Sequence, residues 1–287
     1  MNRFSAVTIV VLIVAPLLFA SAQDGETIRI PGVERAIRKD SKQLWLDYSK
    51  VTDAGLKDLA QLTNLNVLSL SDTEVTGAGL ADLTQLKDLR ILFLREAKVT
   101  DEGLKGLAQL KQLTDVHLTD TMVTDVGLKQ LGQLEKLAVL ELTSTKVTDA
   151  GLKELGRLKQ LTILFLRKTE ITGAGLKELT QLKKLAMLDL SCTKVSDTGL
   201  KDLRQLKQLE SLGLDDTKVT DAGLKEVGHL KQLTWLSLMN LKMTDAGLKE
   251  LTQLKQLTWL QLSNTETTDA GLREIKAALP KCRVVKD

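Results

Sequence analysis

One histidine in this chain is spaced so that it can lie beside a carboxylate. His117 and Glu141 are separated by 24 residues, an interval that recurs along the sequence. A histidine held against a carboxylate can act as a general base. No nucleophile with a matching oxyanion donor is evident around this pair, so the sequence predicts a protein that is not an enzyme.

Other side chains suited to ligation or redox chemistry are too sparse to form a site. With two histidines and two cysteines in the whole chain, neither a multi-histidine metal site nor a cysteine-based zinc cluster can be built. Gly173–Lys177 lacks the spacing of a phosphate-binding loop. Cys192 and Cys282 lie almost four repeat units apart, ~15–20 Å at strand spacing, whereas a disulfide needs Cα atoms within ~7 Å. We therefore expect no cofactor, no metal and no intrachain disulfide.

A hexapeptide that recurs at a fixed interval must set the positions of these side chains. Val51–Leu56 reads V-T-D-A-G-L, and related hexapeptides follow every 24 residues without insertion or deletion. A constant period of this length predicts a solenoid of stacked units. The hexapeptides begin at Val51, Val75, Val99, Val123, Val147, Ile171, Val195, Val219, Met243 and Thr267.

Each unit has the pattern of a short strand followed by a helix. In the unit 137–158, Leu140 and Leu142 flank a polar residue, which predicts a strand with one buried face. Three later leucines are spaced by three residues, as in a helix. They are Leu152, Leu155 and Leu158.

The residues between strand and helix predict how the helix begins. Thr148 is placed to cap the helix, and Asp149 follows in the positively polarised first turn. Gly151 lies inside the helix start, where alanine would be better by ~1 kcal/mol. We therefore expect that the glycine is needed because the neighbouring unit approaches closely.

The pattern L-x-x-L-x-L followed by V-T-D-x-G-L resembles the leucine-rich repeat family, from roughly Leu44 to the C-terminus. The hexapeptide is most similar to the ribonuclease-inhibitor-like repeats of F-box-associated and bacterial GALA-type proteins. This resemblance implies an α/β fold, a right-handed horseshoe solenoid with a concave parallel β-sheet and convex helices. Thr145 and its equivalents stand where the F-box relatives have cysteine, and no F-box-like module precedes the repeats. The resemblance is therefore to secreted bacterial proteins, and no ubiquitin-ligase role follows.

The N-terminal segment has the pattern of a secretory signal peptide. Arg3 is followed by the uncharged, mostly apolar run 6–19, and small residues precede a cleavage site after Ala22. A retained membrane anchor is the alternative, but Pro16 and the cleavage pattern disfavour it. We expect a signal peptide over 1–22 and a secreted, periplasmic or cell-envelope protein without membrane insertion after cleavage.

The two ends of the solenoid need caps that cover the terminal units. We expect an N-terminal cap over 23–43, with a short helix after Pro31, then about ten repeats over 44–279. A C-terminal cap over 280–287 is expected to add a last short strand at Val284 and Val285.

Aromatic residues avoid the repeated core positions. Because the strand leucines point inward, the residues beside them point outward, and the aromatic side chains after the signal segment lie in or next to these outward columns. Exposed aromatic residues over a leucine core are typical of a recognition surface; the alternative is that they pack on neighbouring strands and stiffen the sheet. They are Trp45, Tyr48, Phe93, Phe165, Trp235 and Trp259.

Two groups of outward residues are candidates for partner contacts. The sequence I-L-F-L-R occurs at Ile91–Arg95 and again at Ile163–Arg167, and each arginine is within cation–π reach of a partner or of its own phenylalanine. Trp235 and Trp259 are expected on adjacent strands, ~4.8 Å apart. They can stack on a protein loop or a sugar ring, or pack on each other.

The charge balance narrows the class of partner. Lys and Arg number 40 against 37 Asp and Glu, a net charge of +3, which lacks the basic excess of a nucleic-acid binder. We predict a non-catalytic module that binds a protein partner on its concave face, with carbohydrate binding or a passive structural role in the envelope as alternatives. The predicted contact residues are Trp45, Phe93, Arg95, His117, Phe165, Arg167, Trp235 and Trp259.

Overall fold

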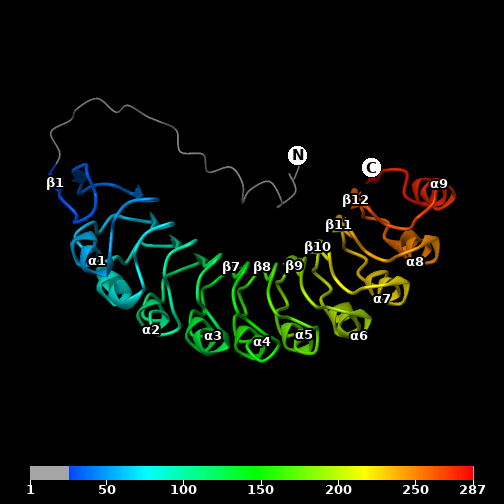
Figure 1. Cartoon of the computed structure of the whole chain (residues 1–287), viewed down its shortest axis with the longest axis horizontal. Helices are drawn as coiled ribbons and strands as arrows, with labels where there is room; N and C mark the ends of the chain where they lie inside the picture. The colour runs from blue at the N-terminus through cyan, green and yellow to red at the C-terminus, as the bar shows by residue number, and fades with distance from the viewer. Residues whose placement is uncertain (1–25, 287) are drawn as a thin grey trace.

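The protein is a curved solenoid with its strands on the inner side of the arc and its helices on the outer side (Figure 1). The computed structural model describes residues 26–286. The predicted signal peptide and its cleavage site lie outside these residues. The predicted α/β solenoid, with a concave parallel sheet and convex helices, is confirmed.

The inner wall is an 11-stranded parallel sheet in which each strand pairs with the next one in sequence. Every residue pairs with the residue one repeat later, so that Phe93 is opposite His117. The 24-residue period therefore fixes the register. The strands are β3 (Gln43–Trp45), β4 (Val67–Ser69), β5 (Ile91–Phe93), β6 (Asp115–His117), β7 (Val139–Glu141), β8 (Ile163–Phe165), β9 (Met187–Asp189), β10 (Ser211–Gly213), β11 (Trp235–Ser237), β12 (Trp259–Gln261) and β13 (Arg283–Val285).

The outer wall consists of short α- and 3₁₀-helices that stack on one another. Within residues 26–286, no helix is long and apolar enough to cross a membrane. The helices are α1 (Asp53–Leu59), η2 (Ala78–Gln85), α2 (Leu104–Leu107), α3 (Asp125–Leu131), α4 (Leu152–Leu155), α5 (Leu176–Leu179), α6 (Asp197–Leu200), η3 (Lys201–Gln205), α7 (Asp221–Val227), α8 (Asp245–Glu250), η4 (Leu251–Gln253) and α9 (Asp269–Ala278).

Leucine fills the space between the two walls. Leu140 and Leu142 of the strand and Leu152 and Leu155 of the helix are all completely buried. Of the residues that the structure describes, no phenylalanine, tyrosine or tryptophan belongs to this core. The predicted sidedness, with leucine inside and aromatic rings outside, is therefore confirmed.

Aspartates of the recurring hexapeptides accept hydrogen bonds from the threonine of the next repeat. The Asp125 carboxylate accepts hydrogen bonds from the Thr148 backbone N–H at 2.8 Å and from its Oγ1 at 2.6 Å. A Cβ at Gly151 would lie 2.4 Å from Asp125 Oδ1, so the glycine is needed for close approach, as predicted. The pairs are Asp53–Thr76, Asp101–Thr124, Asp125–Thr148, Asp149–Thr172, Asp197–Thr220, Asp221–Thr244 and Asp245–Thr268.

The predicted threonine cap is also present. Thr148 Oγ1 accepts a hydrogen bond from the Ala150 N–H at 3.2 Å, and Thr124 caps α3 in the same way. Each of these hydroxyls donates to the preceding repeat while accepting a backbone N–H that follows it. Thr124 is the N-cap of α3 as predicted, whereas α4 begins only at Leu152 and its N-cap is Gly151. The bond to the preceding repeat depends on how the repeats stack.

The N-terminal cap differs from the prediction. A helix after Pro31 is wrong: β1 (Thr27–Ile28) and β2 (Ile37–Arg38) form an antiparallel pair, and the chain turns between them. Gly32 in this turn has φ +84°, a backbone conformation that glycine adopts readily and that ends any helical path. At the other end, the predicted last strand is confirmed as β13.

Candidate functional site

The strand register aligns the outward residues into rows across the concave face. Trp45, Phe93 and His117 share one row with Phe165, whereas Trp235 and Trp259 lie in the adjacent row. The eight predicted contact residues are therefore on one face but in separate groups. Arg95 and Arg167 follow β5 and β8 directly.

Three rings at the N-terminal end of the sheet form a continuous stack. The Trp45 and Phe93 ring centroids are 5.5 Å apart, and those of Phe93 and His117 are 4.4 Å apart with an interplanar angle of 18°. Ser69, on the strand between Trp45 and Phe93, is only 1% exposed. We call Trp45, Phe93 and His117 the aromatic stack.

The aromatic stack ends in an ion pair. His117 Nδ1 donates a hydrogen bond to Glu141 Oε2 at 2.8 Å, which confirms the predicted proximity of the two residues. Burial by itself would raise the pKa of Glu141, but the hydrogen bond to His117, together with other nearby groups that include the charge of Arg95, lowers this pKa. Because His117 is only 7% exposed, little of the imidazole is accessible to a ligand.

The outward columns are less exposed than the sequence suggested. Met187 and Asp215 are each only 5% exposed. Strands ~4.8 Å apart bring side chains of neighbouring repeats into contact, so a smaller residue beside large ones lies at the bottom of a groove. The phenylalanine and tryptophan side chains on this face stay partly exposed.

The arginines of the two I-L-F-L-R segments do not stack on their own phenylalanines. Arg95 Nε instead donates to Glu96 Oε1 at 3.0 Å. The cation–π contact found within 26–286 lies elsewhere, with Arg283 Cζ 4.8 Å from the Trp259 ring centroid. The intramolecular form of the predicted cation–π interaction is therefore wrong, and for Arg95 the reason is that the adjacent Glu96 is an easier partner to reach.

Trp235 and Trp259 are register partners on β11 and β12. In the part of the chain that the structure describes, ring contacts are confined to the aromatic stack, so these two indoles do not pack on each other. Arg283 covers one face of Trp259. Trp235 stays partly exposed and borders a hollow.

That hollow lies over β9 and β10 and has a volume of about 70 Å³. Gly213 forms part of its floor, where a Cβ would lie 2.5 Å from Asp189 Oδ1. We call it the Gly213 hollow. Sequence reasoning missed it, although a glycine inside a strand is a known sign that another group approaches closely. Its lining residues are Phe165, Met187, Leu188, Asp189, Ser211, Gly213 and Trp235.

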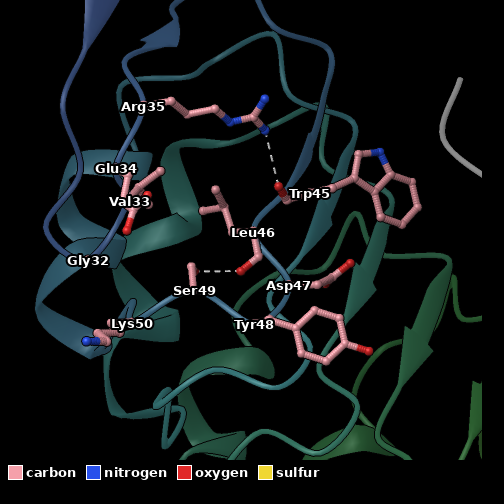
Figure 2. Close-up of a pocket in the computed structure, with 10 residues that line it drawn as sticks. All are labelled: Gly32, Val33, Glu34, Arg35, Trp45, Leu46, Asp47, Tyr48, Ser49 and Lys50. Atoms are coloured by element: carbon pink, nitrogen blue, oxygen red, sulfur yellow. Dashed lines mark hydrogen bonds between the residues drawn. The ribbon is translucent and has the colours of Figure 1, made fainter. Parts of the chain in front are cut away.

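A larger hollow of about 690 Å³ lies at the N-terminal end, between the cap segment 32–35 and the segment 45–50. Figure 2 shows Trp45 and Tyr48 projecting away from the cap residues, while Arg35 Nη2 donates to the Trp45 carbonyl at 3.4 Å. Tyr48 is 82% exposed. The sequence could not predict this hollow, since its cap wall is the turn that we expected to be a helix.

Charge is distributed unevenly between the two walls. We count the positions equivalent to Gln43, Trp45, Asp47 and Tyr48 in every repeat as the concave face and its rim. At these positions carboxylates outnumber cations, although the whole chain is slightly basic. The cations there are Arg95, Arg167, Lys168 and Arg283. The carboxylates are Asp47, Asp72, Glu96, Asp115, Asp120, Glu141, Asp189, Asp215 and Asp216.

In the C-terminal half the charge of Arg167 only partly offsets the raised pKa of Asp215. Within 26–286, Asp189, Asp215 and Asp216 form no salt bridge. Burial raises the pKa of Asp215, and the nearby charge of Asp189 adds to this effect. An approaching cation would meet a favourable field here.

The two thiols are separate and partly buried. Cys192 and Cys282 are both free. Burial raises the pKa of Cys282 to about 11, so this thiol is largely protonated and unreactive at neutral pH.

The sequence matches a protein-family model described as "Leucine-rich repeat region" over residues 43–269. The chain belongs to the leucine-rich repeat family. The family-level resemblance seen in the sequence is thereby confirmed, and leucine-rich repeat folds are typical of protein-interaction modules. A search of curated proteins finds no match.

Solved leucine-rich repeat structures share the fold. An internalin, InlF, from Listeria monocytogenes is 21% identical with a TM-score of 0.59, covering 88% of this chain and 89% of InlF. The functional domain of InlJ from Listeria monocytogenes is 22% identical with a TM-score of 0.60, covering 87% of this chain and 50% of that one. The plant peptide hormone receptor RGFR1, solved in complex with RGF2, is 18% identical with a TM-score of 0.58, covering 87% of this chain and 40% of the receptor. The present chain thus spans half or less of the latter two.

Proposed function

We propose that this leucine-rich repeat protein is a non-catalytic binding module that holds a protein partner against its concave face. The observation that carries the proposal is the placement of the aromatic residues. The rings of Trp45, Phe93, Phe165, Trp235 and Trp259 all lie on the concave face, partly exposed and outside the leucine core. Aromatic residues and arginine dominate the energetics of protein interfaces.

The proposal gives the predicted contact residues different roles. Phe165, Trp235 and Trp259, with Arg167, form the main contact surface because their neighbours leave them partly open. Trp45, Phe93 and Arg95 extend it toward the N-terminal end. His117 packs beside Phe93 on the neighbouring strand through the 4.4 Å ring contact and orients it, with little direct contact to the partner.

Carbohydrate is a weaker candidate for the same face. Sugar rings commonly stack on exposed aromatic rings, but one face of Trp259 is occupied by Arg283. The concave acidic excess also favours a partner that carries positive charge, and unmodified sugars do not. Electrostatic complementarity of this kind directs encounter and register in protein complexes.

We propose further that the chain is exported, with residues 1–22 removed. The support is the single charge at Arg3, the apolar run and the small residues before the cleavage site. N-terminal sequencing of the protein from its native cells should give Gln23 as the first residue.

The test of the binding function uses crosslinking from defined positions. A photoreactive amino acid placed at Gln261, which is partly exposed on β12, should capture a protein in intact cells, and the same probe at Lys153 on α4 should not. The captured protein, once purified, should bind the double variant Phe165→Ala/Trp235→Ala about 100-fold more weakly, since two interface anchors at ≥ ~1.4 kcal/mol each are lost.

A matched control changes two helix-side residues, Lys153→Ala and Lys177→Ala, and should retain affinity. Unchanged binding by the folded Phe165→Ala/Trp235→Ala protein contradicts the proposal. Capture from Lys153 alone would place the partner on the convex side, and specific binding on a glycan array would replace the protein partner with a carbohydrate.

A further inference from the structure

We propose that the Gly213 hollow is a specificity site that receives the cationic end of one lysine or arginine side chain of the partner. This inference rests on the proposed function and adds the chemistry that the concave face selects.

The walls suit the methylene chain of a basic residue. Phe165 stands on β8 and Trp235 on β11, so an aromatic ring bounds the hollow on either side of β9 and β10. Met187 adds apolar surface between them. Long cationic side chains bury their methylenes against such surfaces, and their charged ends are attracted to the faces of aromatic rings.

The floor brings a carboxylate to the place where the cation would arrive. Asp189 Oδ1 accepts the Ser191 backbone N–H at 2.9 Å, which fixes the carboxylate. Asp189 lines the hollow, and within the described residues no hydrogen bond reaches its Oδ2. Gly213 keeps this position open, because any side chain there would meet Asp189 Oδ1 and Ser191 Oγ.

Three carboxylates near the hollow outnumber the one cation whose charge reaches them, Arg167 after β8. Asp189, Asp215 and Asp216 lie on β9 or just after β10 with no salt bridge among the residues described. Glu141 and Glu96, by contrast, are paired with His117 and Arg95. An incoming ammonium or guanidinium group gains charge-assisted hydrogen bonds that the chain itself does not supply here.

The size of the hollow restricts its occupant to part of one side chain. A volume of about 70 Å³ is well below the ~300–1,000 Å³ that is typical of pockets for small molecules. A sugar ring or a nucleotide is therefore too large. The end of a lysine or arginine fits, with the rest of its chain between the two rings.

The inference is tested without the partner, by titrating the ¹⁵N-labelled protein with Nα-acetyl-lysine methylamide and following backbone amides by NMR. The arginine analogue distinguishes the two cations, and the norleucine analogue is the uncharged control of similar length. We expect saturable shifts centred on Ser211 and Gly213, with the norleucine compound binding at least five-fold more weakly than the better cation.

Two variants locate the response. Asp189→Asn retains the shape of the side chain and should weaken binding of the cationic probe at least five-fold. Gly213→Ala fills the floor and should abolish the response. Asp88→Asn makes the same chemical change at an exposed position between η2 and β5 and should leave binding unchanged. Circular dichroism and thermal unfolding verify that each variant is folded.

The outcomes separate this inference from the proposed function. Absence of shifts at Ser211 and Gly213, equal binding of the norleucine analogue, or an unaltered titration of Asp189→Asn overturns the cation site while concave-face crosslinking still stands. Failure of the crosslinking with a saturable, Asp189-dependent lysine or arginine response would leave the cation site standing and remove the larger proposal.

Discussion

The same five residues, I-L-F-L-R, occur in β5 and β8 and meet different surroundings. Phe93 lies in the aromatic stack between Trp45 and His117, and its arginine is paired with Glu96. Phe165 has Glu141 and Asp189 as its row neighbours and borders the Gly213 hollow. One segment completes a packed cluster, and the other forms the edge of an open site.

The difference extends to charge. At the N-terminal half, the carboxylate that faces the rings is compensated by a hydrogen bond from His117. At the C-terminal half, Asp189 and Asp215 act on each other unfavourably, which contributes to the raised pKa of Asp215. The carboxylate of Asp215 has hydrogen-bond donors in Ser237 and Met239, so what differs between the two carboxylates is the compensation of charge and not the number of hydrogen bonds.

The largest expected effect is a loss of stability that differs between Phe93 and Phe165. Phe93→Ala should lower the free energy of unfolding by roughly 2–3 kcal/mol, because it removes ring contacts on both sides and leaves a gap above Ser69. Phe165→Ala should cost about 1 kcal/mol, since one side of its ring already faces a hollow. Urea unfolding followed by circular dichroism measures both, with Phe→Leu at each position as the control. Equal losses for the two alanine variants would show that the two surroundings are equivalent.

A smaller loss of stability is expected when the pair of Glu141 and His117 is broken. Glu141→Gln should lower stability at pH 7 by roughly 1–2 kcal/mol, the range of a hydrogen bond to a charged group. Because the pKa of Glu141 is lower when folded, its contribution is complete above the ordinary value of ~4.3 and is lost as the pH falls through the folded value. The gap between wild type and variant should therefore narrow from pH 5 to pH 3. A gap that stays constant over this range would contradict the assignment.

The smallest expected effect is a gain in stability when the charge of Asp215 is removed. The pKa of Asp215 is raised in the folded protein, so the ionised form weakens the fold as the pH rises through the folded value. Asp215→Asn keeps an oxygen for the donors Ser237 and Met239 and should stabilise the protein at pH 7 by up to roughly 1 kcal/mol. The gain should vanish below pH 3. A loss comparable to that of Glu141→Gln would remove the charge contrast between the two halves.

Much of the fold could be predicted because each repeat uses the same local pattern. Leu140, Leu142, Leu152 and Leu155 were assigned to the core from spacing alone, and all are buried. The hydrogen bond that the Thr148 hydroxyl accepts from a nearby backbone N–H could be predicted from residue type and position in the same way. The hydrogen bond from Thr148 to Asp125 could not be predicted, because it joins two repeats at a distance that depends on how the helices stack.

The candidate site was less predictable for the same reason. Trp235 and Trp259 were correctly placed on adjacent strands, but their lack of ring contact depends on side-chain directions that no periodic pattern encodes. His117 was expected to be accessible and is covered by Phe93. The Pro31–Gly32 turn was mistaken for a helix start, since proline at the beginning of a segment is compatible with both.

The sequence by itself determined the period, the register, the leucine interior and the face on which the aromatic rings lie, because these follow from spacing along one chain. Only the tertiary structure decided which rings stack, which carboxylates are compensated and where a hollow stays open. These properties depend on contacts between side chains 24 or more residues apart, and such contacts form only after the repeats have stacked.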